Sequence, residues 1–182
     1  IIDIPSFVDF MLLNELTSNV DAYEFSTYFH KDKNGKLRAG PIWDFNLTMG
    51  NDLFMYGLDR SNTSVWQFDN GDNIGPRFWK DLFDETNFRC YLSKRWNELI
   101  SNGMPFNHTQ LRQFIEETDE LLAEAIVREQ QAWGSVPNHA SNVENMISWL
   151  SRRIDWIDAN IGSFSTCQNV NTPPLVISKI NY

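Results

Sequence analysis

The second half of the sequence is dominated by apolar side chains that recur every three or four residues. That spacing places them on one face of an α-helix, so it restricts this half to packed amphipathic helices. Four helices are expected: one beginning at Pro76, one from Thr86 to Gly103, one capped near Thr109 and one starting at Ser141. Their apolar stripes are interpreted as core, and their charged residues are interpreted as a solvated face: Glu116, Glu117, Arg152 and Arg153.

A further helix is expected over residues 4–18. Asp3 followed by Pro5 is a typical helix start, because Asp caps free N–H groups and Pro fits the first turn. Apolar side chains then follow at helical spacing from Phe7 onward. The polar run 17–21 ends this helix, so Asn19 and Asp21 are expected on a loop, with Asp21 displayed there and not buried in a helix.

Alternating side chains over residues 25–30, a turn at 32–36 and a returning run over 37–42 predict a β-hairpin. The loop that carries Asp21 enters one strand, and Asp44 leaves the other. Because neighbouring ends of an antiparallel pair lie together, we expect Asp21 and Asp44 to face one site. The predicted fold class is α+β, mainly α, with a hairpin that carries these two carboxylates beside a helical bundle.

Asp44 directly follows the apolar run Pro41-Ile42-Trp43 and precedes a Gly50-Asn51 turn. A carboxylate at a strand end can bind a metal ion in an open cleft, while a second carboxylate acts as a base. Alternatively, Asp44 only caps a turn, as Asp residues at strand ends often do. These residues alone leave both interpretations open.

Apolar residues over 52–75 show no sustained helical or strand periodicity, which predicts a long ordered loop with short elements. Within it, residues 69–73 read Asp-Asn-Gly-Asp-Asn, which can either hold a cation or form a solvated turn. Near the end of the sequence, residues 175–180 form an apolar run that predicts a strand leading to a following module.

The composition argues against several classes of function. A formal charge of −9 in 182 residues argues against a nucleic-acid-binding surface, which needs clustered Lys and Arg. No apolar run is long enough to span a membrane, and the start lacks the basic head of a signal peptide, so we expect a mature or excised segment. Cys90 and Cys167 permit either one long-range disulfide or two buried thiols.

Several short motifs occur in an ordered series, most densely between Asn14 and Asn51. They are Ser6-Phe7-Val8-Asp9, Asn14-Glu15-Leu16-Thr17, Asn19, Asp21, Ser26, Tyr28, Gly35-Lys36-Leu37, Gly40-Pro41-Ile42-Trp43-Asp44-Phe45, Phe88, Arg95-Trp96 and the run 149–160. This series resembles the CotH kinase family, the spore coat protein H-like atypical secretory protein kinases. The resemblance implies a protein-kinase-like C-terminal lobe over residues 1–162, followed by a tail or linker over 163–182.

The resemblance also implies a reaction, namely transfer of phosphate from ATP to protein hydroxyls with Mg²⁺ or Mn²⁺ as the metal. It assigns metal binding to Asp44, supported by Asn46, and the role of the catalytic-loop residue to Asp21. Asn19 and Asn46 are the expected cofactor-binding residues. The family usually carries a second Asp where this chain has Asn46, a weaker metal ligand. That difference favours the alternative of a catalytically inactive, kinase-like binding or scaffold module.

Two further expectations concern the parent protein. The sequence holds no Gly-rich phosphate-binding loop, so we expect this segment alone to be inactive even if the parent is an ATP-dependent kinase acting on a protein substrate. The resemblance implies a secreted, cell-surface or spore-coat location, where thiols oxidise, and hence a Cys90–Cys167 disulfide.

Overall fold

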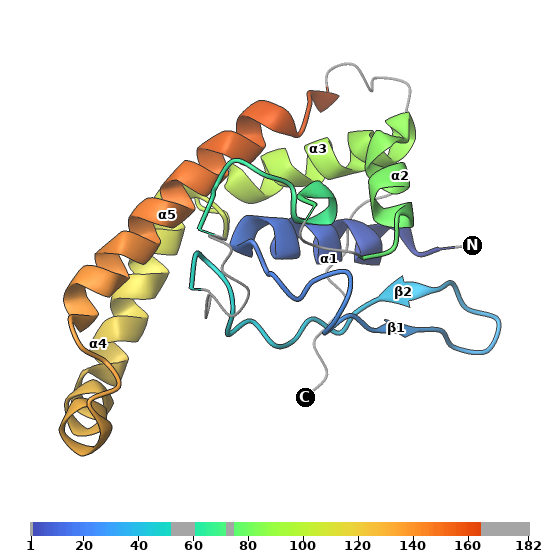
Figure 1. Ribbon diagram of the computed structural model, residues 1–182. Helices are drawn as coiled ribbons and strands as arrows, with labels where there is room; N and C mark the ends of the chain where they lie inside the picture. Colours follow the sequence, from blue (N-terminus) through green and yellow to red (C-terminus); the bar gives the residue numbers. More distant parts are fainter. Residues whose placement is uncertain (1, 52–60, 72–74, 165–182) are drawn as a thin grey trace.

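The computed structural model describes residues 2–51, 61–71 and 75–164 (Figure 1). These residues form five α-helices, one short 3₁₀-helix and one two-stranded antiparallel sheet. In chain order the elements are α1 (Ile4–Thr17), β1 (Phe29–His30), β2 (Arg38–Ala39), η1 (Gln67–Asp69), α2 (Phe78–Asp84), α3 (Thr86–Ile100), α4 (His108–Trp133) and α5 (His139–Asn160). The expectation of an α+β, mainly helical fold is confirmed.

Helix α1 is the central element, with α3 on one side and the β-hairpin on the other (Figure 1). Its start is as predicted, because the Asp3 carboxylate accepts a hydrogen bond from the Ser6 backbone N–H at 3.1 Å. Its apolar residues are buried against α3 and α5, where Trp96 and Ile157 are also buried. The C-terminal end of α1 is therefore rigidly placed, and the loop that follows starts from a fixed point.

The Trp79 ring of α2 packs against both α1 and the hairpin. It lies 5.4 Å from the Phe7 ring and 5.3 Å from the Phe10 ring on α1, and 6.0 Å from the Phe29 ring on β1. Buried aromatic pairs of this kind contribute beyond the area they cover. The hairpin is thus held against the core partly through Trp79 of α2 and partly by direct contact with α1, where the Phe29 ring lies 5.7 Å from the Phe7 ring.

The hairpin is confirmed, but its strands are shorter than the predicted ranges 25–30 and 37–42. Phe29 lies opposite Ala39 and His30 opposite Arg38, and a further bond runs from the Gly40 N–H to the Tyr28 carbonyl at 2.9 Å. Before β1 the backbone of Ser26 has a positive φ of 38°, and after β2 that of Gly40 has a φ of 111°. Extended strands need negative φ, so the ladder stops at both points.

The helices of the second half begin close to the predicted positions, with different capping residues. The Glu85 carboxylate caps α3 by accepting from the Phe88 N–H, and Asn107 caps α4 by accepting from the Thr109 N–H. Helix α5 starts two residues before the predicted Ser141.

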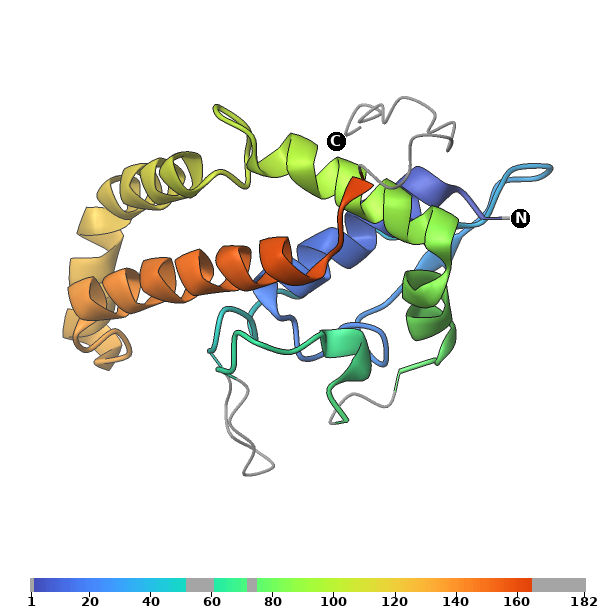
Figure 2. The ribbon, with the colours of Figure 1, turned by 90° about the horizontal axis from the view of Figure 1, so that it is seen from above.

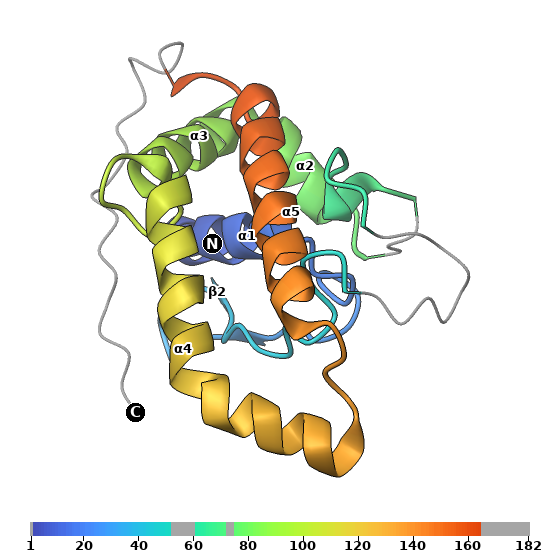
Figure 3. The ribbon, with the colours of Figure 1, turned by 90° about the vertical axis from the view of Figure 1, so that its left-hand side faces the viewer.

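Helices α4 and α5 lie side by side as an antiparallel pair that extends away from the rest of the molecule (Figures 1 and 2). Figure 3 shows that α4 changes direction partway along. The Thr118 hydroxyl donates to the Phe114 carbonyl at 2.7 Å, a side-chain contact that often bends helices.

Two predictions about these helices are wrong. The apolar stripe of α4 is not core, since none of its residues is buried and Leu121 is 83% exposed. Arg153 is not on a solvated face, since its side chain is 0% exposed. It falls three residues after Leu150 and four before Ile157, which places it on the buried stripe of α5. The solvated face predicted for Glu116, Glu117 and Arg152 agrees with their exposure.

Several predictions fall outside the described residues. The strand at 175–180 and Cys167 lie there, so the Cys90–Cys167 disulfide and the tail over 163–182 stay predictions; Cys90 itself is buried. In the loop, Asp69 forms an ion pair with Lys80, while Asp72 and Asn73 are not described. Within the described part of the chain, no helix is both long enough and apolar enough to cross a membrane.

Candidate functional site

Two loops that are distant in sequence run antiparallel to each other at the end of α1. The Met49 N–H donates to the Thr17 carbonyl at 2.7 Å, and the Val20 N–H donates to the Leu47 carbonyl at 3.4 Å. Residues just after α1 therefore pair with residues just after the hairpin. As a result, the loop that carries Asp21 lies along the loop that carries Asp44.

Asp44 leaves the hairpin in a left-handed conformation, with a φ of 63°. Asp tolerates this backbone better than most residues, and here it turns the side chain toward the first loop. The Ser26 hydroxyl donates to an Asp44 carboxylate oxygen at 3.1 Å. Asp44 is otherwise exposed to solvent. Its carboxylate is thus anchored through one hydroxyl while the rest remains accessible to a ligand.

Asn19 organises the first loop from within. It is only 1% exposed, and its amide nitrogen donates to the Asn14 side-chain oxygen at 3.1 Å. Its side-chain oxygen accepts from the Asp21 backbone N–H at 3.2 Å. Both ends of the carboxamide are therefore used by the protein, which fits a residue that positions Asp21. Direct contact of Asn19 with a cofactor stays a prediction.

Asp21 is partly buried, and its backbone is held at both ends. Its N–H donates to Asn19, and its carbonyl accepts from the Phe25 N–H at 3.0 Å. The loop between Asn19 and Phe25 is therefore a closed turn rather than an extended segment. Because this loop pairs with residues 47–49, the segments around Asp21 and Asp44 are brought together; a shared cleft for the two carboxylates stays a prediction.

Asn46 follows Asp44 by two residues and is exposed. Its backbone carbonyl accepts from the Asn51 side chain at 3.0 Å, and the Thr48 hydroxyl donates to the Phe45 carbonyl at 2.8 Å. These bonds shape the loop from Phe45 to Asn51 without using the Asn46 carboxamide. Asp44 and Asn46 thus offer oxygen ligands from the same loop.

A buried charged cluster connects the Asp21 loop to the helices α1 and α5. We call it the Glu15 hub, and its members are Glu15, Tyr23, Gln67, Phe68 and Arg153. The Glu15 carboxylate accepts from the Tyr23 hydroxyl at 2.7 Å, the Gln67 N–H at 2.8 Å, the Phe68 N–H at 3.2 Å and Arg153 Nη2 at 3.1 Å. Arg153 also donates to the Glu15 backbone carbonyl at 2.8 Å and to the carbonyls of Thr63 and Val65 at 2.7 and 2.6 Å.

Burial dominates the electrostatics of this hub. It raises the pKa of Glu15 above its usual value, although the charge of Arg153 and the donated hydrogen bonds act in the opposite direction. It lowers the pKa of Arg153, opposed chiefly by Glu15. The pKa of Tyr23 lies well above its usual value, because of burial and then the charge of Glu15. Tyr23 belongs to the Asp21 loop, so the hub joins that loop to α1 and α5.

Sequence reasoning missed both the hub and a cleft beside Asn46. The cleft lies between the loop Phe45–Asn51 and the first turns of α5, with a volume of about 850 Å³. Its polar lining residues are Asn46, Thr48, Asn51, Ser61, His139, Asn142, Asn145, Ser148 and Arg152. The signal for Arg153 was its place on the apolar stripe of α5; the cleft left no local signal, because its walls are distant in sequence.

The residues present fit a metal ion that is shared with a phosphate ligand. In the described part of the chain, no three His, Cys, Asp or Glu side chains gather as a metal-binding group. Mg²⁺ in phosphate-transfer sites is usually held by one or two carboxylates together with substrate phosphates and water. Asp44 and Asn46 supply oxygen ligands of the type that Mg²⁺ and Mn²⁺ prefer.

The family model described as CotH kinase protein matches residues 1–157, a range that begins before α1 and ends within α5. No curated protein and no solved structure matches the chain.

Proposed function

The chain belongs to the CotH kinase family, and from this premise we propose that it is the C-terminal lobe of an atypical protein kinase. The reaction is transfer of the γ-phosphoryl group of ATP to hydroxyl groups of a protein substrate. The observation that carries this proposal is the antiparallel pairing of the two loops, which brings the segments around Asp21 and Asp44 together at the end of α1. Kinase chemistry needs such a pair, because one acid holds the metal and the other serves the acceptor.

In the proposed reaction the acceptor hydroxyl oxygen forms a bond to the γ-phosphorus, and the bond to the β,γ-bridging oxygen breaks. ADP leaves with the electron pair of that bond. Asp21 accepts a hydrogen bond from the acceptor hydroxyl and takes up its proton, which then passes to solvent. The backbone bonds of Asp21 to Asn19 and Phe25 support this role, because they fix the position of Asp21 within its loop.

Asp44 is the proposed metal ligand, together with Asn46. A bound Mg²⁺ or Mn²⁺ neutralises charge on the phosphates of ATP. Asp44 is oriented by Ser26, so its carboxylate is already turned toward the loop that carries Asp21. Asn46 contributes a neutral oxygen, so we expect weaker metal binding in the absence of nucleotide than with an acid at this position.

The proposed location is outside the cytoplasm: secreted, on the cell surface or in a spore coat. The family to which the chain belongs is related to the spore coat, and this supports a surface location. A Cys90–Cys167 disulfide, which we still predict, fits an oxidising compartment.

Transfer of radiolabelled γ-phosphate to protein hydroxyls tests the proposal, with Mg²⁺ or Mn²⁺ present and with the longest native polypeptide that contains this sequence. Asp44→Ala is expected to reduce labelling to background, because the metal ligand is lost. Asp21→Ala is expected to reduce it by about 10² to 10⁴, the range typical of a lost general base. Asp32→Ala is the matched control, since Asp32 is an exposed acid on the hairpin turn, and it is expected to leave labelling unchanged.

A second candidate function is a binding or scaffold module without catalysis, and Asn46 is the observation that favours it. Asn46→Asp separates the two candidates, because it restores the acid that the family usually carries. Increased labelling means that Asn46 weakens a working enzyme. If the wild type and the Asn46→Asp variant are both folded and inert, yet bind a protein partner, the scaffold function holds and the kinase proposal fails.

A further inference from the structure

The cleft between the loop Phe45–Asn51 and α5 has the size of a ligand site. Its volume of about 850 Å³ lies within the range of roughly 300 to 1,000 Å³ usual for such sites. Carboxamides line both sides of the cleft, and its apolar lining residues are Phe45, Met49, Val143, Met146 and Trp149. Asn46 and Asn51 come from the loop, while Asn142 and Asn145 come from α5.

The charge of this cleft differs from that of the rest of the protein. The chain carries a formal charge of −9, yet among the described residues that line the cleft none is Asp or Glu. Arg152 and His139 are the basic side chains among its described lining residues, and His139 pairs with Asp119. A guanidinium whose described neighbours in the lining are uncharged amides and hydroxyls attracts an anionic group.

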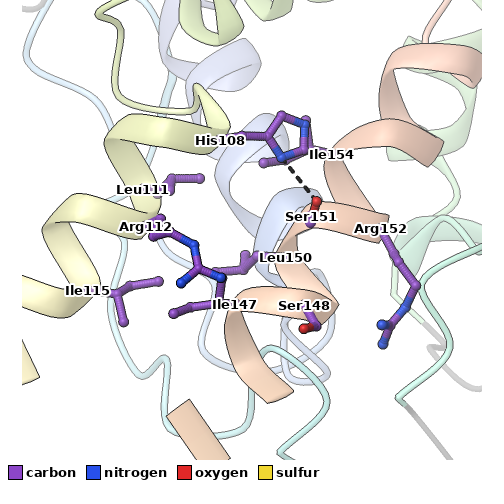
Figure 4. A pocket seen from close by; sticks show the side chains of 10 residues that line it. All are labelled: His108, Leu111, Arg112, Ile115, Ile147, Ser148, Leu150, Ser151, Arg152 and Ile154. Atoms are coloured by element: carbon purple, nitrogen blue, oxygen red, sulfur yellow. Dashed lines mark hydrogen bonds between the residues drawn. The ribbon is translucent and has the colours of Figure 1, made fainter. Parts of the chain in front are cut away.

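Arg152 is also exceptional among the arginines that the structure describes. The others form ion pairs with carboxylates, except Arg89, which donates to the carbonyls of Asn160 and Ile161. Arg152 has no such partner within the described ranges. Figure 4 shows its side chain turned away from His108 and from Arg112, which pairs with Glu116 and Glu144. Its guanidinium is thus available for a ligand in the cleft.

We infer that this cleft binds the protein substrate of the proposed reaction, and that Arg152 recognises an acidic or phosphorylated side chain close to the acceptor hydroxyl. The inference rests on the proposed function, because Asn46 belongs both to the candidate metal ligands and to the cleft wall. The carboxamides on the two walls match the donors and acceptors of a polypeptide backbone. A single unpaired guanidinium suits one carboxylate or phosphate rather than a triphosphate.

The test is a binding titration that needs no catalysis, followed through the indole N–H signal of Trp149 in the ¹⁵N-labelled protein. Trp149 lines the cleft, and its signal is assigned with Trp149→Phe. The probes are three short synthetic Ser-Ala peptides that carry one phosphoserine, one glutamate or only serine. The phosphoserine and glutamate peptides are expected to bind at least about tenfold more tightly than the serine peptide, the effect of a charge-assisted contact.

Variants assign this preference to Arg152. Arg152→Ala is expected to remove it, and Arg152→Lys to retain part of it, because Lys keeps the charge and loses the forked geometry. Arg128→Ala is the matched control, since Arg128 is an exposed arginine on α4 that pairs with Glu124 and does not line the cleft. It is expected to bind all three peptides as the wild type does.

Three results would overturn the inference. They are equal binding of all three peptides, an unchanged preference in Arg152→Ala, and an Arg152-dependent shift of the Trp149 signal with Mg²⁺-ATP but not with the peptides. The last result would assign the cleft to the nucleotide. Failure here is separable from failure of the proposed function, because loss of labelling in Asp44→Ala tests the reaction and does not depend on the cleft.

Discussion

Helices α4 and α5 lie side by side and carry similar alternation of apolar and charged residues, but they are anchored in different ways. Helix α5 buries six residues, among them Arg153 and Ile157. Helix α4 buries none, although Leu111 and Ile115 pack against the edge of the core. An amphipathic pattern therefore identifies a helix and its apolar face, while the tertiary neighbours decide whether that face is covered.

The polar contacts of the two helices differ in the same way. Helix α4 is joined to α5 by exposed pairs, such as Arg112 with Glu144 at 3.3 Å and His108 with Asp155 at 3.2 Å; the Ser151 hydroxyl bonded to His108 is visible in Figure 4. Exposed pairs contribute little to stability. In the Glu15 hub every charge is buried, and losing one partner leaves the other uncompensated. The hub is therefore the place where a single substitution should cost the most.

The largest effect is expected for Arg153→Met. It leaves the Glu15 carboxylate buried without its cation and leaves the carbonyls of Thr63 and Val65 without their donor. Breaking a buried pair in this way typically lowers the free energy of unfolding by about 3 to 5 kcal/mol. Urea denaturation at pH 7 measures it. Arg152→Met on the adjacent residue is the control, with a change expected within about 0.5 kcal/mol because Arg152 is exposed.

The stability loss in Arg153→Met should also depend on pH. Burial already raises the pKa of Glu15, and the charge of Arg153 is the strongest effect opposing that rise, so the variant raises this pKa further. A carboxyl group with a raised folded pKa contributes stability below its unfolded pKa, and this contribution is lost as pH rises through the folded pKa. The difference from wild type is therefore expected to shrink between pH 7 and pH 5. A difference that stays constant or grows on acidification would contradict the assignment to Glu15.

The hub also shows which features could be predicted from the sequence. Asp3 and Pro5 predicted the start of α1, and the alternation before and after the turn at 32–36 predicted the hairpin, because both signals are local. Arg153 was predicted to be solvated because charged residues usually are, although its spacing from Leu150 and Ile157 places it on the buried stripe. Its partner Glu15 is 138 residues away, and no local pattern carries that pairing.

The candidate site likewise has features that the sequence predicted and features that it did not. Asp21 and Asp44 were singled out from the loops that end predicted elements and from an ordered series of motifs. Contact of Asn19 with a cofactor stays a prediction, whereas the bonds of its side chain to Asn14 and to the backbone of Asp21 depend on how the chain closes after α1. The cleft beside Asn46 could not be predicted, since it exists only where the loop Phe45–Asn51 meets α5.

An intermediate effect is expected for Tyr23→Phe, which removes one donor from the hub and keeps the ring. Glu15 retains the Gln67 and Phe68 N–H groups and Arg153, so the charge stays paired. Loss of a buried hydrogen bond to a charged group typically costs about 1.5 to 3 kcal/mol in the free energy of unfolding. Urea denaturation measures it, with Tyr28→Phe on the half-exposed Tyr28 as the control, expected within about 0.5 kcal/mol. A cost equal to that of Arg153→Met would mean that the hydroxyl, rather than the ion pair, holds the hub together.

The smallest effect is expected for Leu121→Ser on α4. Leu121 is 83% exposed, so the substitution removes little buried area, and the free energy of unfolding should change by less than about 0.5 kcal/mol. Ile157→Ala on α5 is the matched comparison and should cost about 2 to 5 kcal/mol, because it leaves a cavity in the core. Both are measured by urea denaturation at two protein concentrations.

A different result would show that the apolar face of α4 is covered by another copy of the chain in solution. In that case Leu121→Ser destabilises the protein by more than about 1 kcal/mol and the loss grows with protein concentration, since only an intermolecular contact responds to concentration. The contrast between α4 and α5 would then separate a face buried within one chain from a face buried between chains.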